Sequence, residues 1–214
     1  MNLYFVSGLG ADQRIFERLQ LPQSWKIYHI KWLKPKKRES LYDYTQRLAS
    51  QINISTEFSL LGLSFGGIVA IEMSKFLNPE KLILISSVST DSDLPVKYKF
   101  VRSLGLHKLV PSFLFKKTTA LTYWFFGVKK DSDRRLLKKI IEETSGDFLK
   151  WSIDKILNWK NERRPINLFH IHGEKDKLLP CDLVHADVII QNAGHLMVYT
   201  HSKDVSEELI KHVN

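Results

Sequence analysis

The fold of this chain is decided by one stretch, Phe58-Ser59-Leu60-Leu61-Gly62-Leu63-Ser64-Phe65-Gly66-Gly67, which continues through Ile68 to Phe76. It begins with an apolar run of strand length, and the residues after Gly67 are predicted to form a helix. Between the two, Gly62, Ser64 and Gly66 make the pattern G-x-S-x-G. A strand that passes directly into a helix turns sharply, and glycine two positions either side of the serine avoids clashes. The stretch therefore predicts a serine raised above a strand end, at the N-terminus of a helix.

Strands and helices alternate through most of the chain. Six apolar runs are predicted to be strands: residues 2–6, 25–30, 58–63, 81–85, 166–171 and 186–191. Helices are predicted at 12–19 and 41–52, after the serine turn, and from a cap at Ser202 or Asp204 to about residue 213. This alternation predicts a parallel sheet with helices on both faces, whose functional groups gather at the carboxyl ends of the strands. Ser64, Asp176 and His195 each follow a predicted strand.

Residues 91–165 interrupt this alternation. Helices are predicted there at 96–104, 111–115, 119–126, 131–144 and 147–158. The segment holds 17 Lys+Arg and 9 Asp+Glu, so it carries eight of the net charges in a chain of +9. A solvated helical surface explains such an excess, and the functional interpretations are attraction of an anionic substrate or contact with an acidic membrane surface. We expect one domain with its core in residues 1–90 and 166–214. Residues 91–165 should form a helical cap, with Tyr123 to Phe126 and Trp151 lining a pocket beneath it.

Size and composition argue against several classes of protein. The chain has 214 residues, the size of one domain. No apolar run reaches the roughly 18 residues that span a bilayer, and no signal-peptide pattern opens the chain. Cys181 is the only cysteine, so an internal disulfide cannot form and a cytoplasmic location is expected. No cluster of Cys and His has zinc spacing, and no nucleic-acid-binding module is recognisable.

Three positions have side chains suited to a nucleophile, its base and a carboxylate that orients the base. A serine hydroxyl such as that of Ser64 is a weak nucleophile at neutral pH and needs a base within hydrogen-bond reach. Histidine suits this role because its pKa lies near working pH, and a carboxylate fixes its tautomer. Asp176 lies 112 positions after Ser64, and His195 lies 19 positions after Asp176, which gives the order Ser, Asp, His. The alternative is a glycine-rich turn in which Ser64 only caps the helix.

The sequence resembles the α/β-hydrolase superfamily over essentially its whole length. Gly62 to Gly67 is similar to the superfamily's nucleophile elbow, His172-Gly173-Glu174-Lys175-Asp176 with Pro180 to its acid loop, and Ala193-Gly194-His195 to its histidine loop. With Ser7-Gly8-Leu9-Gly10-Ala11-Asp12 near its start, the chain is most similar to small bacterial members that open with S-G-L-G-A-D. The resemblance implies a catalytic triad of Ser64, Asp176 and His195. It also implies an oxyanion hole made by the backbone N–H groups of Leu9 and Phe65, and no metal or organic cofactor.

The chain departs from the superfamily pattern in two places. No strands precede residues 2–6, so we expect a minimal six-stranded α/β-hydrolase sheet with helices on both faces and a helical cap. Ser7-Gly8 stands where many members have His-Gly, but main-chain oxyanion donors do not depend on that side chain. Some members carry the acid after the strand that corresponds to residues 81–85. Asp91 and Asp93 therefore remain alternatives to Asp176.

Together these features predict a serine hydrolase that cleaves a carboxylic ester, thioester or lactone through an acyl-enzyme. Acyl transfer and C–C bond hydrolysis on the same triad remain alternatives, as does a small-molecule-binding protein on a hydrolase fold with little turnover. The expected partner is a small acyl substrate, and the basic segment would favour an anionic one. Neither nucleic acid nor stable membrane insertion is expected.

Overall fold

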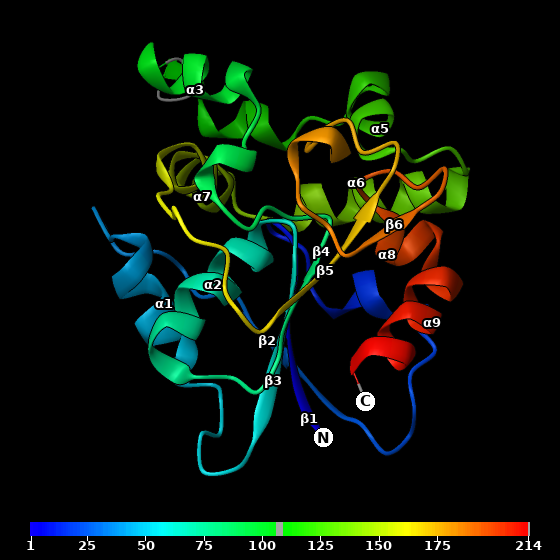
Figure 1. The fold of residues 1–214 in the computed structure, drawn as a ribbon. Coiled ribbons are helices and arrows are strands. Elements are labelled where there is room, and N and C mark those ends of the chain that lie inside the picture. Colours follow the sequence, from blue (N-terminus) through cyan, green and yellow to red (C-terminus); the bar gives the residue numbers. More distant parts are fainter. Residues whose placement is uncertain (106–108, 214) are drawn as a thin grey trace.

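The computed structural model describes residues 1–105 and 109–213, apart from the side chain of Lys99. Within them, one parallel sheet contains six strands in the order β2-β1-β3-β4-β5-β6. The strands are β1 (Asn2–Val6), β2 (Lys26–Ile30), β3 (Phe58–Leu63), β4 (Leu82–Ile85), β5 (Leu168–Gly173) and β6 (Val188–Ile190). The sheet forms the middle layer of the molecule in Figure 1. The predicted fold class, with its minimal six strands, is confirmed.

Each face of the sheet has its own core, because successive side chains of a strand point to opposite faces. Leu60 lies in the core beneath α1 (Leu41–Ala49) and α2 (Phe65–Leu77), on one face of the sheet. Leu61 lies in the other core, beneath η1 (Gln13–Phe16), α8 (Met197–Thr200) and α9 (Ser202–Val213). These two groups of helices flank the sheet in Figure 1. The fold therefore has three layers, with β3 and its serine turn near the centre.

The helices of residues 91–165 lie above the carboxyl ends of the strands (Figure 1). They are η2 (Asp91–Asp93), α3 (Val96–Ser103), η3 (Ser112–Lys116), α5 (Ala120–Phe126), α6 (Asp131–Glu143) and α7 (Gly146–Asn158). Two of them contribute buried residues to the cores. Leu137 and Ile140 of α6 join the core on one face, and Phe148 of α7 joins the core on the other. The segment is thus attached to the sheet through both cores.

Several predicted boundaries were wrong. Strand β5 begins at Leu168 because Ile166 is fully exposed, and it runs on to Gly173, so that His170 and His172 are buried in the sheet. Strand β6 contains only Val188–Ile190. Helix α1 ends at Ala49, because Ser50 turns back and its N–H and hydroxyl both donate to the Arg47 carbonyl. The predicted helix at 12–19 is a single 3-10 turn, capped by Asp12 as expected.

The C-terminal region contains an element that the sequence pattern did not predict. Helix α8 (Met197–Thr200) follows the loop of His195 directly. Its residues Met197, Val198 and Tyr199 are buried, so the turn serves to pack the histidine loop onto the core. Ser202 is consequently the first residue of α9 and not its cap.

Candidate active site

The turn between β3 and α2 has the strained geometry that the G-x-S-x-G pattern requires. Ser64 has φ of 53° and ψ of −120°, a region that residues with a side chain rarely adopt. A Cβ atom at Gly62 would lie 2.4 Å from Gly67 Cα, and one at Gly66 would lie 2.2 Å from the Val6 carbonyl oxygen. Both contacts are far inside van der Waals range. The two glycines are therefore required by close backbone packing around the serine.

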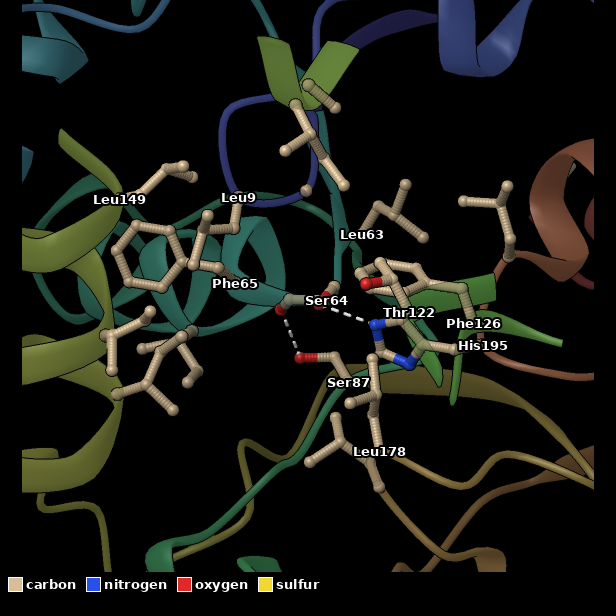
Figure 2. A pocket seen from close by; sticks show the side chains of 18 of the residues that line it. Leu9, Leu63, Ser64, Phe65, Ser87, Thr122, Phe126, Leu149, Leu178 and His195 are labelled. Atoms are coloured by element: carbon tan, nitrogen blue, oxygen red, sulfur yellow. Dashed lines mark hydrogen bonds between the residues drawn. The ribbon is translucent and has the colours of Figure 1, made fainter. Parts of the chain in front are cut away.

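Hydrogen bonds from the neighbouring strand hold the strained serine in place. The Ser64 N–H donates to the Ile85 carbonyl at 3.0 Å. The Ser87 hydroxyl donates to the Ser64 carbonyl at 2.7 Å, as Figure 2 shows. Sequence reasoning missed Ser87, since a serine just after a strand is common. Its only signal was its position directly after β4, at the carboxyl edge of the sheet.

Three side chains form a continuous hydrogen-bonded chain. His195 Nδ1 lies 2.7 Å from Asp176 Oδ2, and His195 Nε2 lies 2.9 Å from Ser64 Oγ. A carboxylate only accepts hydrogen bonds, so Nδ1 carries the proton and Nε2 is free to accept from the Ser64 hydroxyl. Asp176 and His195 are buried, whereas Ser64 borders a cavity. Three residues far apart in the sequence thus have the arrangement of a nucleophile, a base and an orienting acid.

Asp176 stays ionised although it is buried. Burial alone would raise its pKa, but the neighbouring His195, its hydrogen bond, and His172 together lower the pKa below its ordinary value. Its second oxygen, Oδ1, accepts from the backbone N–H groups of Leu178 and Leu179, each at 2.9 Å. The carboxylate is therefore fixed from two sides, and one oxygen points to His195.

The alternative acids lie elsewhere and have other partners. Asp93 is buried, and its carboxylate accepts hydrogen bonds from the N–H and hydroxyl groups of Ser89 and Thr90. Asp91 pairs with Lys160 at 2.9 Å. The Asp93 carboxylate thus holds the start of the η2 turn, and that of Asp91 joins the turn to Lys160. Of the three candidate acids, Asp176 is the one that the structure places against His195.

Two buried histidines stand behind the acid loop. His172 Nε2 lies 2.8 Å from the Leu179 carbonyl oxygen, so this nitrogen carries a proton. His172 Nδ1 must then accept from His170 Nε2, which lies 3.2 Å away. His172 Nε2 also lies 3.4 Å from Asp176 Oδ2. Burial lowers the pKa of both rings, that of His170 to about 3, so both are neutral near pH 7.

The two residues predicted to supply the oxyanion donors both lie near the serine. Leu9 and Phe65 both line the cavity beside Ser64 (Figure 2). Leu9 belongs to a tight loop in which the Ala11 N–H donates to the Gly8 carbonyl at 2.9 Å. The Ser7 hydroxyl donates to the Ala11 carbonyl at 2.5 Å. Ser7 thus stabilises this loop through its own hydrogen bonds.

The loop of Leu9 is also attached to the cap. Gly10 has φ of 69°, and a Cβ there would lie 2.3 Å from the Thr144 side chain. The Thr144 hydroxyl lies 2.7 Å from two acceptors, the carbonyl oxygens of Gly10 and Ile140, which share its one proton. Sequence reasoning missed Thr144, because nothing local links it to a residue 134 positions earlier. This contact connects the loop of Leu9 to helix α6 of the cap.

A cavity of about 460 Å³ opens beside Ser64, and its lining is mainly aliphatic. The residues 91–165 supply much of this lining, including Leu149, Ile153 and Ile156 of α7 and Thr122 and Phe126 of α5. Lys117 is the one Lys or Arg among the described lining residues. The cavity is therefore suited to an apolar group.

The prediction that Tyr123 to Phe126 and Trp151 line this cavity was wrong for all but Phe126. On α7 the lining residues Leu149 and Ile153 are four positions apart, so Trp151 between them points away. Its ring packs on Tyr44, with centroids 4.5 Å apart. Trp124 is exposed, with the Lys177 ammonium 3.7 Å above its ring.

Among the described residues, no group of three or more His, Cys, Asp and Glu side chains is arranged to hold a metal ion. In the same part of the chain, no helix is long and apolar enough to cross a bilayer.

Comparisons with known proteins agree with this architecture. No family model and no curated protein matches the chain. Among solved structures, an esterase from Exiguobacterium antarcticum matches with a TM-score of 0.75 at 16% identity, over 100% of this chain and 91% of that chain. A putative lipase from Acinetobacter baumannii AYE matches with a TM-score of 0.76 at 13% identity, over 99% and 83%. A thermophilic esterase from Thermogutta terrifontis, solved with malate bound, gives 0.71 at 15% identity, over 100% and 89%. The chain has the α/β-hydrolase fold.

Proposed function

We propose that this protein is a serine hydrolase that cleaves a carboxylic ester, thioester or lactone through an acyl-enzyme. The observation that carries the proposal is the chain of hydrogen bonds from Ser64 through His195 to Asp176, placed at the wall of an apolar cavity. A strained serine raised above a strand end, with a base at 2.9 Å, has the geometry of an activated nucleophile. The esterases among the structural neighbours support the same reaction class.

The first half of the reaction forms the acyl-enzyme. Ser64 Oγ attacks the carbonyl carbon, and its proton passes to His195 Nε2. The negative charge of the tetrahedral intermediate develops on the former carbonyl oxygen, which the N–H groups of Leu9 and Phe65 would stabilise. When the intermediate collapses, the bond to the leaving alcohol or thiol breaks, and that group takes the proton from His195. Asp176 stabilises the imidazolium in between.

The second half releases the product. Water attacks the acyl carbon while His195 Nε2 takes its proton, and Ser64 leaves with the proton returned by His195. The products are a carboxylic acid and the regenerated enzyme. Acyl transfer differs only in the acceptor, since an alcohol or thiol replaces water in this step.

Residues 91–165 would act as a cap that defines the acyl site. Their aliphatic side chains provide the wall opposite Ser64, so water is excluded where the acyl group lies. The lining supports an apolar acyl chain. The net charge suggested an anionic substrate, but among the described lining residues only Lys117 carries a positive charge. We therefore propose that substrate specificity comes from apolar contacts with the cavity wall.

The proposal is tested by intact-mass spectrometry with a fluorophosphonate and with acyl esters of graded chain length. The expected result is a single adduct on Ser64 that Ser64→Ala lacks, together with multiple turnovers on an activated ester. Phosphonylation without turnover would indicate a binding protein on a hydrolase fold. Labelling that persists in Ser64→Ala would show that the nucleophile is another residue.

A further inference from the structure

The cap carries an unusual number of exposed apolar side chains. Fifteen large hydrophobic residues are exposed in the described part of the chain, and eight of them lie between residues 96 and 124. We call these eight the outer cap face: Val96, Phe100, Leu104, Leu109, Phe113, Leu114, Leu121 and Trp124. Leu109 is 78% exposed and Phe100 and Phe113 are each 62% exposed. Scattered exposed hydrophobic residues are common, but a concentration of this kind marks an interaction surface.

The outer cap face points away from the acyl cavity. Val96 and Phe100 of α3 and Leu104 at its C-cap are four positions apart and form one exposed stripe, whereas Tyr98 and Val101 line the cavity. Segment η3 and helix α5 repeat this division, each with exposed apolar residues on one side and cavity-lining residues on the other. Helices α3 and α5 lie at the same end of the molecule, above the carboxyl ends of the strands (Figure 1). One layer of short helices thus separates the cavity from the surface.

The charged residues of the segment that carries the outer cap face are all basic. Residues 94–130 contain eight Lys+Arg and no Asp or Glu, whereas the rest of the cap has nine of each sign. Within the described residues, Lys97, Lys116, Lys117, Lys129 and Lys130 have no ion pair with a carboxylate. Several cations in the rest of the cap do form such pairs, among them Arg134 with Asp131, Lys138 with Glu142 and Lys160 with Asp91. The lysines without a carboxylate partner therefore lie in the same segment of the chain as the exposed apolar residues.

We propose that the outer cap face docks on an anionic phospholipid surface. Exposed Phe, Leu and Trp side chains beside unpaired lysines are the features of a segment that lies in the membrane interface, where apolar groups enter the acyl region and cations meet lipid phosphates. No helix that spans the bilayer is needed for such binding. Binding to an acidic protein would account for the unpaired lysines, but it accounts less well for apolar side chains as exposed as that of Leu109.

This docking goes beyond the proposed hydrolysis, because binding to lipid needs no turnover. It would place the thin outer layer of the cap against the membrane, with the acyl cavity directly behind it. Lipid-soluble substrates would then reach the cavity from the membrane without crossing water.

Vesicle flotation at physiological salt tests the proposal. The protein should float with vesicles of phosphatidylcholine containing about 30% phosphatidylglycerol and much less with phosphatidylcholine alone. Ser64→Ala should float equally well, which separates docking from catalysis. Raising NaCl to about 0.5 M should release most of the protein, because the lysines are screened.

Two sets of variants locate the surface. Phe100→Glu with Leu121→Glu should weaken partition about tenfold or more while leaving turnover of a soluble short-chain ester unchanged. The matched control is Ile54→Glu with Ile166→Glu, two exposed positions next to the amino ends of β3 and β5, which should float like the parent protein. Lys129→Gln with Lys130→Gln should reduce the dependence of binding on salt and on anionic lipid.

Tryptophan fluorescence gives an independent readout. Of the five tryptophans, Trp124 is the exposed one, at 53%. Its emission should shift to the blue on addition of anionic vesicles, and Trp124→Phe should remove the shift. The proposal is overturned if anionic vesicles bind no protein, or if Phe100→Glu with Leu121→Glu floats unchanged. It is also overturned if those variants abolish a dimer of this chain while the parent protein ignores lipid.

Discussion

The sheet around Ser64 and the outer part of the cap differ in how deeply their residues are buried. Around Ser64, strands β3 and β4 are buried on both faces, and α2 buries every residue from Phe65 to Met73. In η3 and α5 no residue is buried. Close packing holds the first region in one arrangement, whereas the second has few apolar contacts to lose when it moves. The hydrogen-bonded residues Ser64, Asp176 and His195 therefore follow strands of the closely packed region, whereas the exposed apolar residues lie in the outer cap.

The largest effect that this comparison predicts concerns the acid of the sheet region. Asp176→Asn should lower kcat by up to about 10⁴-fold, because an amide no longer fixes the His195 tautomer. Asp93→Asn is the matched control, since Asp93 is equally buried but bonds only to the backbone and hydroxyls of its own turn. It should destabilise η2 and leave kcat within about tenfold of the parent. Steady-state kinetics on an activated ester measures both. A mild Asp176→Asn and a crippled Asp93→Asn would show that the acid is misassigned.

The second prediction contrasts one glycine from each region. Gly66→Ala should lower the free energy of unfolding by about 3 kcal/mol or more, because its Cβ would meet the Val6 carbonyl at 2.2 Å. Gly105→Ala should cost only about 1–2 kcal/mol, the strain of its positive φ, because no atom of the described residues lies within 4 Å of the added atom. Urea unfolding followed by circular dichroism gives both values. Equal losses would mean that the cap is packed as rigidly as the turn of Ser64.

The third prediction uses the buried histidines of the sheet. Since burial lowers the pKa of His170 and His172 in the folded chain, the unfolded chain binds protons at a higher pH than the folded one. The free energy of unfolding should therefore be highest above about pH 6.5 and fall as the pH drops, by up to about 1.4 kcal/mol per pH unit for each ring. Urea titrations between pH 7 and pH 5 measure this slope. His170→Gln should flatten it, whereas the same change at the exposed His185 should not.

The smallest predicted effect lies where the two regions meet. Thr144→Val removes the hydroxyl shared by the Gly10 and Ile140 carbonyls, so the loop of Leu9 should be held less well. We expect kcat to fall about fivefold with KM little changed, since an oxyanion donor acts mainly in the transition state. Thr144→Ser keeps the hydroxyl and should restore kcat. A rise in KM alone in Thr144→Val would instead assign Thr144 to substrate binding.

Much of the site could be predicted from the sequence, because it depends on backbone sterics within a few residues and on where the parallel strands end. Backbone sterics within three residues demand the glycines around Ser64, and the ends of parallel strands must share one edge of the sheet. The positions of Asp176 and His195 at that edge followed from the strand pattern and from the resemblance. The catalytic roles of all three residues stay predictions until the variants are measured.

Other features depended on contacts between distant segments. Asp91, Asp93 and Asp176 all follow strands, and only the folded chain shows which carboxylate meets His195. Ser87 and Thr144 have no local signal, since each acts on a backbone carbonyl more than 20 positions away. The boundary of β5 was misjudged because Ile166 is apolar yet fully exposed, which its own sequence neighbourhood does not reveal.

The sequence by itself determined the layered α/β fold, the serine turn and the basic cap, since these follow from periodicity, backbone sterics and charge. Only the tertiary structure decided which face each cap helix presents. A short helix such as α5 is apolar on more than one side, so its own pattern does not say which side covers the cavity. The neighbours of the helix settle this, and they turn Phe126 inward and leave Trp124 in contact with solvent. Of the aromatic residues 123–126, which the sequence alone suggested as a pocket lining, Phe126 therefore lines the cavity, Trp124 is exposed and Tyr123 packs against the core.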